Sequence, residues 1–313
     1  MPTYYTPLED GQPADATTFN GPLEALDQAI GILAQAVQDL ANTPGGAPVC
    51  QGRLTLTSGT PVTTANVAAG TMLYFTPYGG SVISLYDGSA WAQLSFGEVS
   101  TSLAALPANT NHDVFAYLDG GALALELVAW ASDSARATGL TTQDGIFVKS
   151  GDATRRYLGT IRTNPTPGQC ADSETRRFVW NYYNRVVRGM NYTDATSHTY
   201  TTEAYRQWNN NANAKVECVV GRVEGAMLVI SRVRVNYTGT GQGLVVAAAG
   251  HNAITNSNGA DFVQASAAGI SAASLGSRWL TPTQGYNYLA ATEYGAASSP
   301  TFISFNLNAH IDG

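Results

Sequence analysis

The sequence predicts a mainly β protein, in which a short N-terminal α-helical trimeric coiled coil is followed by two antiparallel β domains, the second a β-sandwich or jelly roll. Apolar residues recur at alternating spacings of four and three over residues 19–40. Short strands and glycine-containing turns then alternate over residues 49–163, and the last dozen residues alternate between apolar and polar side chains. The predicted units are residues 1–18, 19–43, 49–163 and 172–313.

The helix predicted over residues 19–42 has a narrow apolar seam, typical of the a and d positions of a coiled coil. Its e and g positions are mostly alanine, where two-stranded coils usually carry charges, so the wider apolar face favours three or more chains. From Pro22 to Asn42 the helix is about 31 Å long, and an isolated helix of that length is marginal in water. We therefore expect these seam residues at a trimer interface: Phe19, Leu23, Leu26, Ile30, Leu33, Val37 and Leu40.

The helix is expected to end at NTPGGAPV, residues 42–49, where Pro44 and two glycines form a joint. Glycine-containing turns between apolar runs then indicate hairpins, and a proline-rich linker, residues 164–169, ends this domain. The strands expected here are 71–75, 81–86, 90–96, 113–118, 122–130, 145–150 and 156–163, with turns at Tyr78-Gly79-Gly80, Asp87-Gly88, Asp119-Gly120-Gly121 and Gly151-Asp152.

The C-terminal domain is predicted as strands joined by loops rich in Gly and Asn, with Glu224-Gly225 as the turn within residues 214–238. Its closing segment is the most regular strand in the sequence. The regular alternation predicts a strand interior to a sheet, with Phe305 and Leu307 almost fully buried. The apolar face of this core strand consists of Ile303, Phe305, Leu307, Ala309 and Ile311.

Composition excludes several classes of function. Only 12% of the residues are charged, the net charge is −7, and the basic residues are scattered, so a nucleic-acid partner is not expected. The N-terminus lacks the pattern of a secretory signal, and no apolar stretch is long enough for a membrane helix. We expect synthesis in a cytosol and no membrane insertion. Cys50, Cys170 and Cys218 lie far apart, which indicates reduced thiols.

The sequence carries no recognisable catalytic motif, so we predict that the protein is not an enzyme and uses no cofactor or metal. His112, His198, His251 and His310 share no ligand spacing. The glycines of residues 239–243 lie between predicted strands and indicate a turn rather than a phosphate loop. Asp113 and the other acidic residues near predicted turns form no pair in sequence, which favours turn and surface roles.

Five aromatic residues leave two interpretations open. They either form core and subunit contacts or present a surface on which sugars stack. Both interpretations use the same side chains: Trp180, Tyr182, Tyr183, Tyr205 and Trp208.

Residues 51–235 resemble two modules of phage virion and tail-fibre-like proteins. The first likeness rests on RLTLTSGTPVTTANV, SLYDGSAWAQL, VFAYLDGGALALELVAW and GIFVKSGDATRRYLGTIRT, in this order. The second rests on RRFVWNYYNRVVR and YRQWNNNANAKVECVVG. The resemblance brings no catalytic residues, but it implies a homotrimeric appendage of a virion.

The resemblance, with which the predicted helical seam agrees, implies a structural protein of a phage virion, a tail fibre or similar appendage. Residues 1–18 contain little apolar material, so we expect another virion protein to hold them, while the C-terminal domain points outward and contacts a glycan or protein of the host surface. A head fibre or decoration protein mounted on the capsid is one alternative. A glycan-degrading tailspike is another, and it would release product from host polysaccharide.

Overall fold

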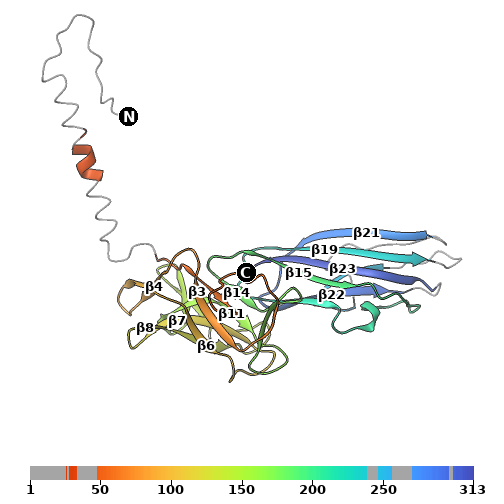
Figure 1. Ribbon diagram of the computed structural model, residues 1–313, viewed down its shortest axis with the longest axis horizontal. Helices are drawn as coiled ribbons and strands as arrows, with labels where there is room; N and C mark the ends of the chain where they lie inside the picture. Colours follow the sequence, from red (N-terminus) through yellow and green to blue (C-terminus); the bar gives the residue numbers. More distant parts are fainter. Residues whose placement is uncertain (1–25, 27, 34–47, 238–245, 256–269, 296–298) are drawn as a thin grey trace, which may run out of the picture.

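The computed structural model describes residues 26, 28–33, 48–237, 246–255, 270–295 and 299–313. These residues form a mainly β protein with several antiparallel sheets, which confirms the predicted class. Residues 26 and 28–33 are helical. Figure 1 shows the earlier strands gathered in one β unit and most of the later strands in a second unit beside it, along the long axis of the molecule.

The first unit contains a three-stranded sheet, a hairpin and a six-stranded sheet. The three-stranded sheet consists of β1 (Gly52–Thr55), β3 (Met72–Pro77) and β6 (Val99–Ser102), and the hairpin of β4 (Val82–Tyr86) and β5 (Trp91–Ser95). The six-stranded sheet consists of β8 (Ala122–Ala129), β7 (Asn111–Asp119), β11 (Asp152–Arg162), β10 (Ile146–Lys149), β9 (Leu140–Gln143) and β14 (Val179–Asn181).

The second unit contains a seven-stranded and a five-stranded sheet. The seven-stranded sheet consists of β17 (Tyr205–Gln207), β22 (Gly285–Tyr294), β18 (Lys215–Val220), β13 (Arg176–Arg177), β12 (Cys170–Ser173), β2 (Val67–Gly70) and β20 (Val246–His251). The five-stranded sheet consists of β15 (Val187–Asp194), β23 (Thr301–Asp312), β19 (Met227–Tyr237), β21 (Ile270–Leu280) and β16 (His198–Thr199). A short 3-10 helix, η1 (Trp208–Asn210), follows β17.

Hydrophobic clusters explain how these sheets pack. One cluster fills the first unit around Leu73 and Ile161 and extends to Cys170 and Ala171 of β12. Another joins the two sheets of the second unit around Val229 and Phe305. A third cluster takes Phe115, Tyr157, Trp180 and Val219 from both units. Burial of apolar area is the main favourable term in folding, so this third cluster holds the two units together.

Several predicted hairpins are confirmed. Strands β7 and β8 pair directly across Gly120 and Gly121, whose φ angles are 57° and 88°. Residues with a Cβ rarely adopt such angles, so two glycines suit this tight turn. The β4–β5 and β10–β11 hairpins also form as expected.

Two other predicted turns join strands that belong to different sheets. After Tyr78-Gly79-Gly80 the chain leaves β3, which pairs with β1 and β6, and enters β4, which pairs with β5. After Glu224-Gly225 it passes from β18 to β19 in the opposite sheet of the second unit. The hairpin interpretation of Tyr78-Gly79-Gly80 is wrong, whereas Glu224-Gly225 lies between two strands as predicted. The same turn residues serve whether the flanking strands pair or separate.

The predicted linker, residues 164–169, is a fixed turn. Asn164 is buried, and its Nδ2 donates to the carbonyl oxygen of Ala68 at 2.7 Å. The amide of Gly168 donates to the carbonyl oxygen of Leu106 at 3.0 Å. Strand pairing also crosses the predicted boundary between residues 163 and 172, because β14 pairs with β11 and β2 pairs with β12. Proline and glycine mark a turn equally well in a linker and in a packed loop.

The last strand, β23, lies between β15 and β19, inside its sheet. Phe305 and Leu307 are 1% and 0% exposed, and Ala309 and Ile311 lie in the same core. A bulge opposite Arg234 changes the alternation near the start of β23. Phe302 therefore faces the core, whereas Ile303 is half-buried, because one extra residue turns the following side chains to the other face.

Candidate functional site

The helix presents part of the predicted seam. Leu26, Ile30 and Leu33 follow the spacing that places side chains on one helical face, and they are 57%, 55% and 66% exposed. Burying one such side chain stabilises a protein by about 1.5–3 kcal/mol, so this face favours contact with another apolar surface. Ile32, outside the seam, is also exposed. The other predicted seam residues, Phe19, Leu23, Val37 and Leu40, lie outside the described residues, as does the segment 1–18.

The β units contain buried carboxylates, each bound to a basic side chain. Asp113, predicted for a turn or surface role, is buried within β7, so that prediction is wrong. Arg136 donates to both of its oxygens, from Nε at 2.6 Å and from Nη2 at 3.2 Å. Burial nevertheless raises the pKa of the Asp113 carboxyl, against the opposing influence of Arg136 and Thr160. Arg136 also donates to the carbonyl oxygen of Gly221, which ties the two units.

Glu293 in β22 has an exposed fraction of zero and binds two basic groups. Its Oε1 accepts from Arg206 Nε at 2.6 Å, and its Oε2 lies 2.5 Å from His198 Nε2. The imidazole stacks on Phe302 and meets Trp208 edge-on. A carboxylate this deep requires such partners, because an isolated buried charge is costly.

Glu217 in β18 has a different balance of forces. Its carboxylate accepts from Arg176 Nε at 2.9 Å, from the Tyr286 hydroxyl, and from Lys215 Nζ at 2.9 Å. Although burial opposes it, hydrogen bonds from Tyr286, Lys215 and Arg176 lower the pKa of the Glu217 carboxyl. Nearby, Asp172 forms ion pairs with Arg177 and Arg188.

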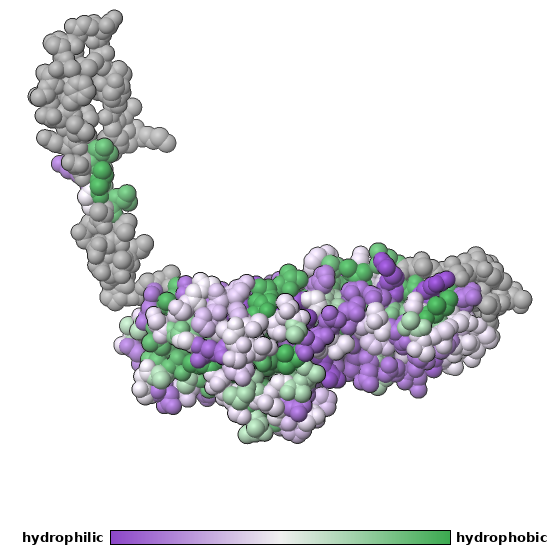
Figure 2. Space-filling view, in the orientation of Figure 1, coloured by the Kyte–Doolittle hydropathy of each residue, from purple (hydrophilic) through white to green (hydrophobic). Residues whose placement is uncertain are grey.

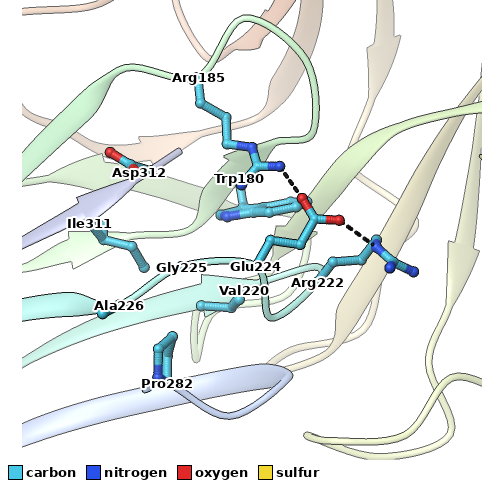
Figure 3. Close-up of a pocket in the computed structure, with 10 residues that line it drawn as sticks. All are labelled: Trp180, Arg185, Val220, Arg222, Glu224, Gly225, Ala226, Pro282, Ile311 and Asp312. Carbon is cyan, nitrogen blue, oxygen red and sulfur yellow. Dashed lines mark hydrogen bonds and ion pairs between the residues drawn. The ribbon is translucent and has the colours of Figure 1, made fainter. Parts of the chain in front are cut away.

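A pocket opens to solvent where the two units meet (Figure 3). Glu224 lies between Arg185 and Arg222 and binds both, while the Arg185 guanidinium stacks over the Trp180 ring. Against the effect of burial, hydrogen bonds from Arg222 and Arg185 lower the pKa of the Glu224 carboxyl. The remaining lining residues are Val220, Gly225, Ala226, Pro282, Ile311 and Asp312. Because Glu224, Arg185 and Arg222 already bind one another, these three side chains stabilise the surface and are not poised for acid–base chemistry.

The second pocket surrounds Glu217 on the outer side of the seven-stranded sheet. It is lined by Thr175, Arg176, Tyr192, Asn213, Lys215 and Glu217. Its carboxylate and both cations already bind one another. A ligand in this pocket would have to break those ion pairs, which disfavours it as a preformed site.

The five candidate aromatic residues separate into two groups. Trp180 and Trp208 are buried in core clusters, whereas Tyr182, Tyr183 and Tyr205 are half-buried. Tyr182 contacts the rings of Phe147 and Trp180, and Tyr205 contacts Tyr294. The structure therefore favours core contacts over an open sugar-stacking surface for the two tryptophans.

Other candidate chemistry remains dispersed in the part of the chain that the structure describes. No group of three or more metal-binding side chains forms there, and the three cysteines are free thiols. Burial raises the pKa of Cys50 to about 11 and that of Cys218 to about 12, so neither favours the thiolate. Among the described helical residues, none forms a stretch long and apolar enough to cross a bilayer. The glycine-rich segment 239–243 lies outside the described residues.

Sequence reasoning missed the buried ion pairs. Asp113 pairs with Arg136 over 23 residues and Glu293 with His198 over 95, so no local spacing relates the partners. One signal was available, since Glu217 lies between Val216 and Cys218 in a mostly apolar segment. A carboxylate in such a strand predicts a buried basic partner but does not identify it.

No family model and no curated protein matches this chain. Among solved structures, it is similar to a chain in the structure of infectious bursal disease virus Gx strain. The two chains are 13% identical with a TM-score of 0.27, and the match covers 80% of this chain and 69% of the other. It is also similar to dimeric latent PorU from Porphyromonas gingivalis, at 10% identity and a TM-score of 0.28, over 67% and 20%. A third similar structure is a β-porphyranase from Bacteroides plebeius, at 9% identity and a TM-score of 0.23, where the match covers 79% of this chain and 36% of the other. These scores carry no argument about function.

Proposed function

We propose that this chain is a structural subunit of a phage virion, a homotrimeric tail fibre or similar appendage. Its N-terminal residues anchor it to the particle, a coiled-coil stalk joins three chains, and a C-terminal β-sandwich projects outward. One observation carries the proposal: Leu26, Ile30 and Leu33 form an exposed apolar face on a helix. Such a face is stabilised by other helices, and the alanine-rich flanks favour three chains.

The β units support a structural role. Asp113, Asp172, Glu217 and Glu293 are buried and each binds a basic side chain, an arrangement that fixes the fold. The resemblance of residues 51–235 to phage virion modules is the reason for proposing that the particle is a phage virion. An appendage mounted on the capsid would have the same organisation and differ in the protein that binds residues 1–18.

Light scattering of the purified protein tests the assembly. We expect about three times the chain mass of 32.9 kDa. A monomer or a stable dimer would contradict the proposal.

Two deletions test the polarity of the appendage. Removing residues 1–18 should leave a soluble trimer that no longer attaches to particles, which electron microscopy of particles mixed with the protein would show. Removing residues 303–313 should prevent soluble assembly, because β23 lies between β15 and β19 in the core. If the first deletion abolished the trimer and the second did not, the assignment of anchor and assembly core would be reversed.

A further inference from the structure

Two arginines on β19 differ from all others in the chain. Arg232 and Arg234 are exposed and have no hydrogen-bond or ion-pair partner in the part of the chain that the structure describes. Each of the other twelve arginines makes a contact within the structure. Because the chain carries a net charge of −7, two unpaired cations on one strand form a locally basic site on an acidic protein.

Both arginines lie on the outer face of the five-stranded sheet. Their neighbours Val233 and Val235 are buried in the core, so alternation turns Arg232 and Arg234 away from it. Two residues along a strand span about 7 Å, so the guanidinium groups can reach neighbouring positions on an extended ligand. Figure 2 shows hydrophilic and hydrophobic residues side by side where Figure 1 places β19 and β21.

A row of amide side chains leads across the sheet to Arg232. Asn191 donates from Nδ2 to Asn308 Oδ1 at 2.8 Å, and Asn308 donates in turn to Asn306 Oδ1. Asn306 is the register partner of Arg232 on β23. Amide and guanidinium groups thus lie together, and both can hydrogen-bond hydroxyl and carboxylate oxygens.

Large apolar side chains complete this face. Trp279 and Leu275 on β21 are 67% and 62% exposed, and they lie in register with Leu228 and Arg232 on β19. An exposed indole ring offers a flat apolar surface with a polar N–H at its edge. Such a ring suits the apolar face of a sugar ring.

We propose that the outer face of the β15–β23–β19–β21 sheet binds an acidic polysaccharide. Arg232 and Arg234 bind its carboxylate or sulfate groups, the amides around Asn306 bind its hydroxyl groups, and Trp279 stacks on a sugar ring. Charge complementarity selects this ligand, because an acidic polymer is repelled by the rest of the chain and attracted here. The inference rests on the proposed function only for the outward position of this unit, since binding requires no particle.

The test compares dextran sulfate and polygalacturonate with uncharged dextran as ligands, in affinity electrophoresis and calorimetry on the full-length protein. We expect binding to the two acidic polymers, weaker at high salt, and none to dextran. Replacing both arginines, Arg232→Gln with Arg234→Gln, should lower the affinity by about tenfold or more. The control pair Arg155→Gln with Arg222→Gln changes the net charge equally at half-exposed ion pairs elsewhere, and it should change affinity by less than about twofold.

Four results would overturn the inference: no preference for the acidic polymers over dextran, equal loss in both pairs of variants, equal binding of duplex DNA, or loss of subunit association in the Arg232 and Arg234 variant. Equal binding of DNA would indicate charge attraction alone, and lost association would identify a contact between subunits. A trimer that fails to bind the polymers overturns this inference and leaves the proposed function standing. A monomer that binds the polymers would contradict the proposed trimer and leave this inference standing.

Discussion

In the helix, Leu26, Ile30 and Leu33 each leave more than half of the side chain exposed, whereas in β23 Phe305 and Leu307 are 1% and 0% exposed. Both segments have regular apolar patterns in the sequence. The strand finds its partners within the chain, in β15, β19 and the facing sheet, while the described helical residues find no such burial. A regular pattern therefore predicts that a face will be buried, and the surrounding structure decides whether the same chain supplies the partner.

We expect the helical seam to control assembly and the β core to control folding. Changes in the helical seam should separate the subunits and leave the β units folded. Changes in the core or in the buried ion pairs should lower the free energy of unfolding and leave the helix able to associate.

The largest effect is expected from Ile30→Asp with Leu33→Asp. Several unpaired carboxylates would enter one small apolar seam in the assembled protein, which is strongly unfavourable. Light scattering should then report a monomer, with the thermal unfolding of the β units unchanged. The matched control is Gln28→Asp with Ile32→Asp, which adds the same charge to the same helix outside the seam. Dissociation by both pairs would show that charge, rather than the seam, controls assembly.

The next effect is expected from Phe305→Ala, which removes a ring from the core of the second unit. Large-to-small changes of buried aromatic residues cost about 3–5 kcal/mol. Urea denaturation should show this loss, while Ile303→Ala, at a half-buried position beside the bulge, should cost about 1 kcal/mol. Similar losses at both positions would mean that the bulge does not set which residue faces the core.

A loss of about 3 kcal/mol is expected from Arg136→Met, which keeps much of the side-chain stem but leaves Asp113 buried without its cation. The control is Arg155→Met, because Arg155 and Glu126 form a half-exposed ion pair, for which about 0–1 kcal/mol is usual. Denaturant unfolding of the two variants compares a buried with a more exposed pair. Losses of the same size would show that burial does not distinguish them.

The sequence predicted the parts of this fold that depend on local pattern. Alternation from Phe305 to Ile311 was enough to predict an interior strand, and Gly120 and Gly121 were enough to predict a hairpin. The pairing of β3 with β1 and β6, the packing of residues 164–169 and the ion pair of Asp113 with Arg136 depend on contacts between distant residues, which periodicity does not encode. In the candidate binding face, the sequence alone shows that Arg232 and Arg234 alternate with apolar residues in one strand. That neither side chain has a hydrogen-bond or ion-pair partner among the described residues depends on the folded structure and not on the pattern.

The smallest effect concerns the pH dependence of Glu217, whose carboxyl has a pKa lowered by three hydrogen-bond donors, whereas burial raises that of Asp113. A lowered pKa in the folded state means that the ionised form stabilises the fold. That stabilisation is complete above the ordinary value of 4.5 and is lost as the pH falls through the folded-state pKa.

Glu217→Gln should therefore cost about 1 kcal/mol at pH 7, and the difference from the unmodified protein should shrink below about pH 4. Asp113 contributes with the opposite sign, since a raised pKa favours the fold at low pH and the contribution is lost as the pH rises. Urea titrations at pH 7, 5, 4 and 3 measure the difference, and Tyr286→Phe, which removes one donor, should weaken the pH dependence. A Glu217→Gln difference that stays constant from pH 7 to pH 3 would show that the carboxylate acts by its shape rather than by its charge.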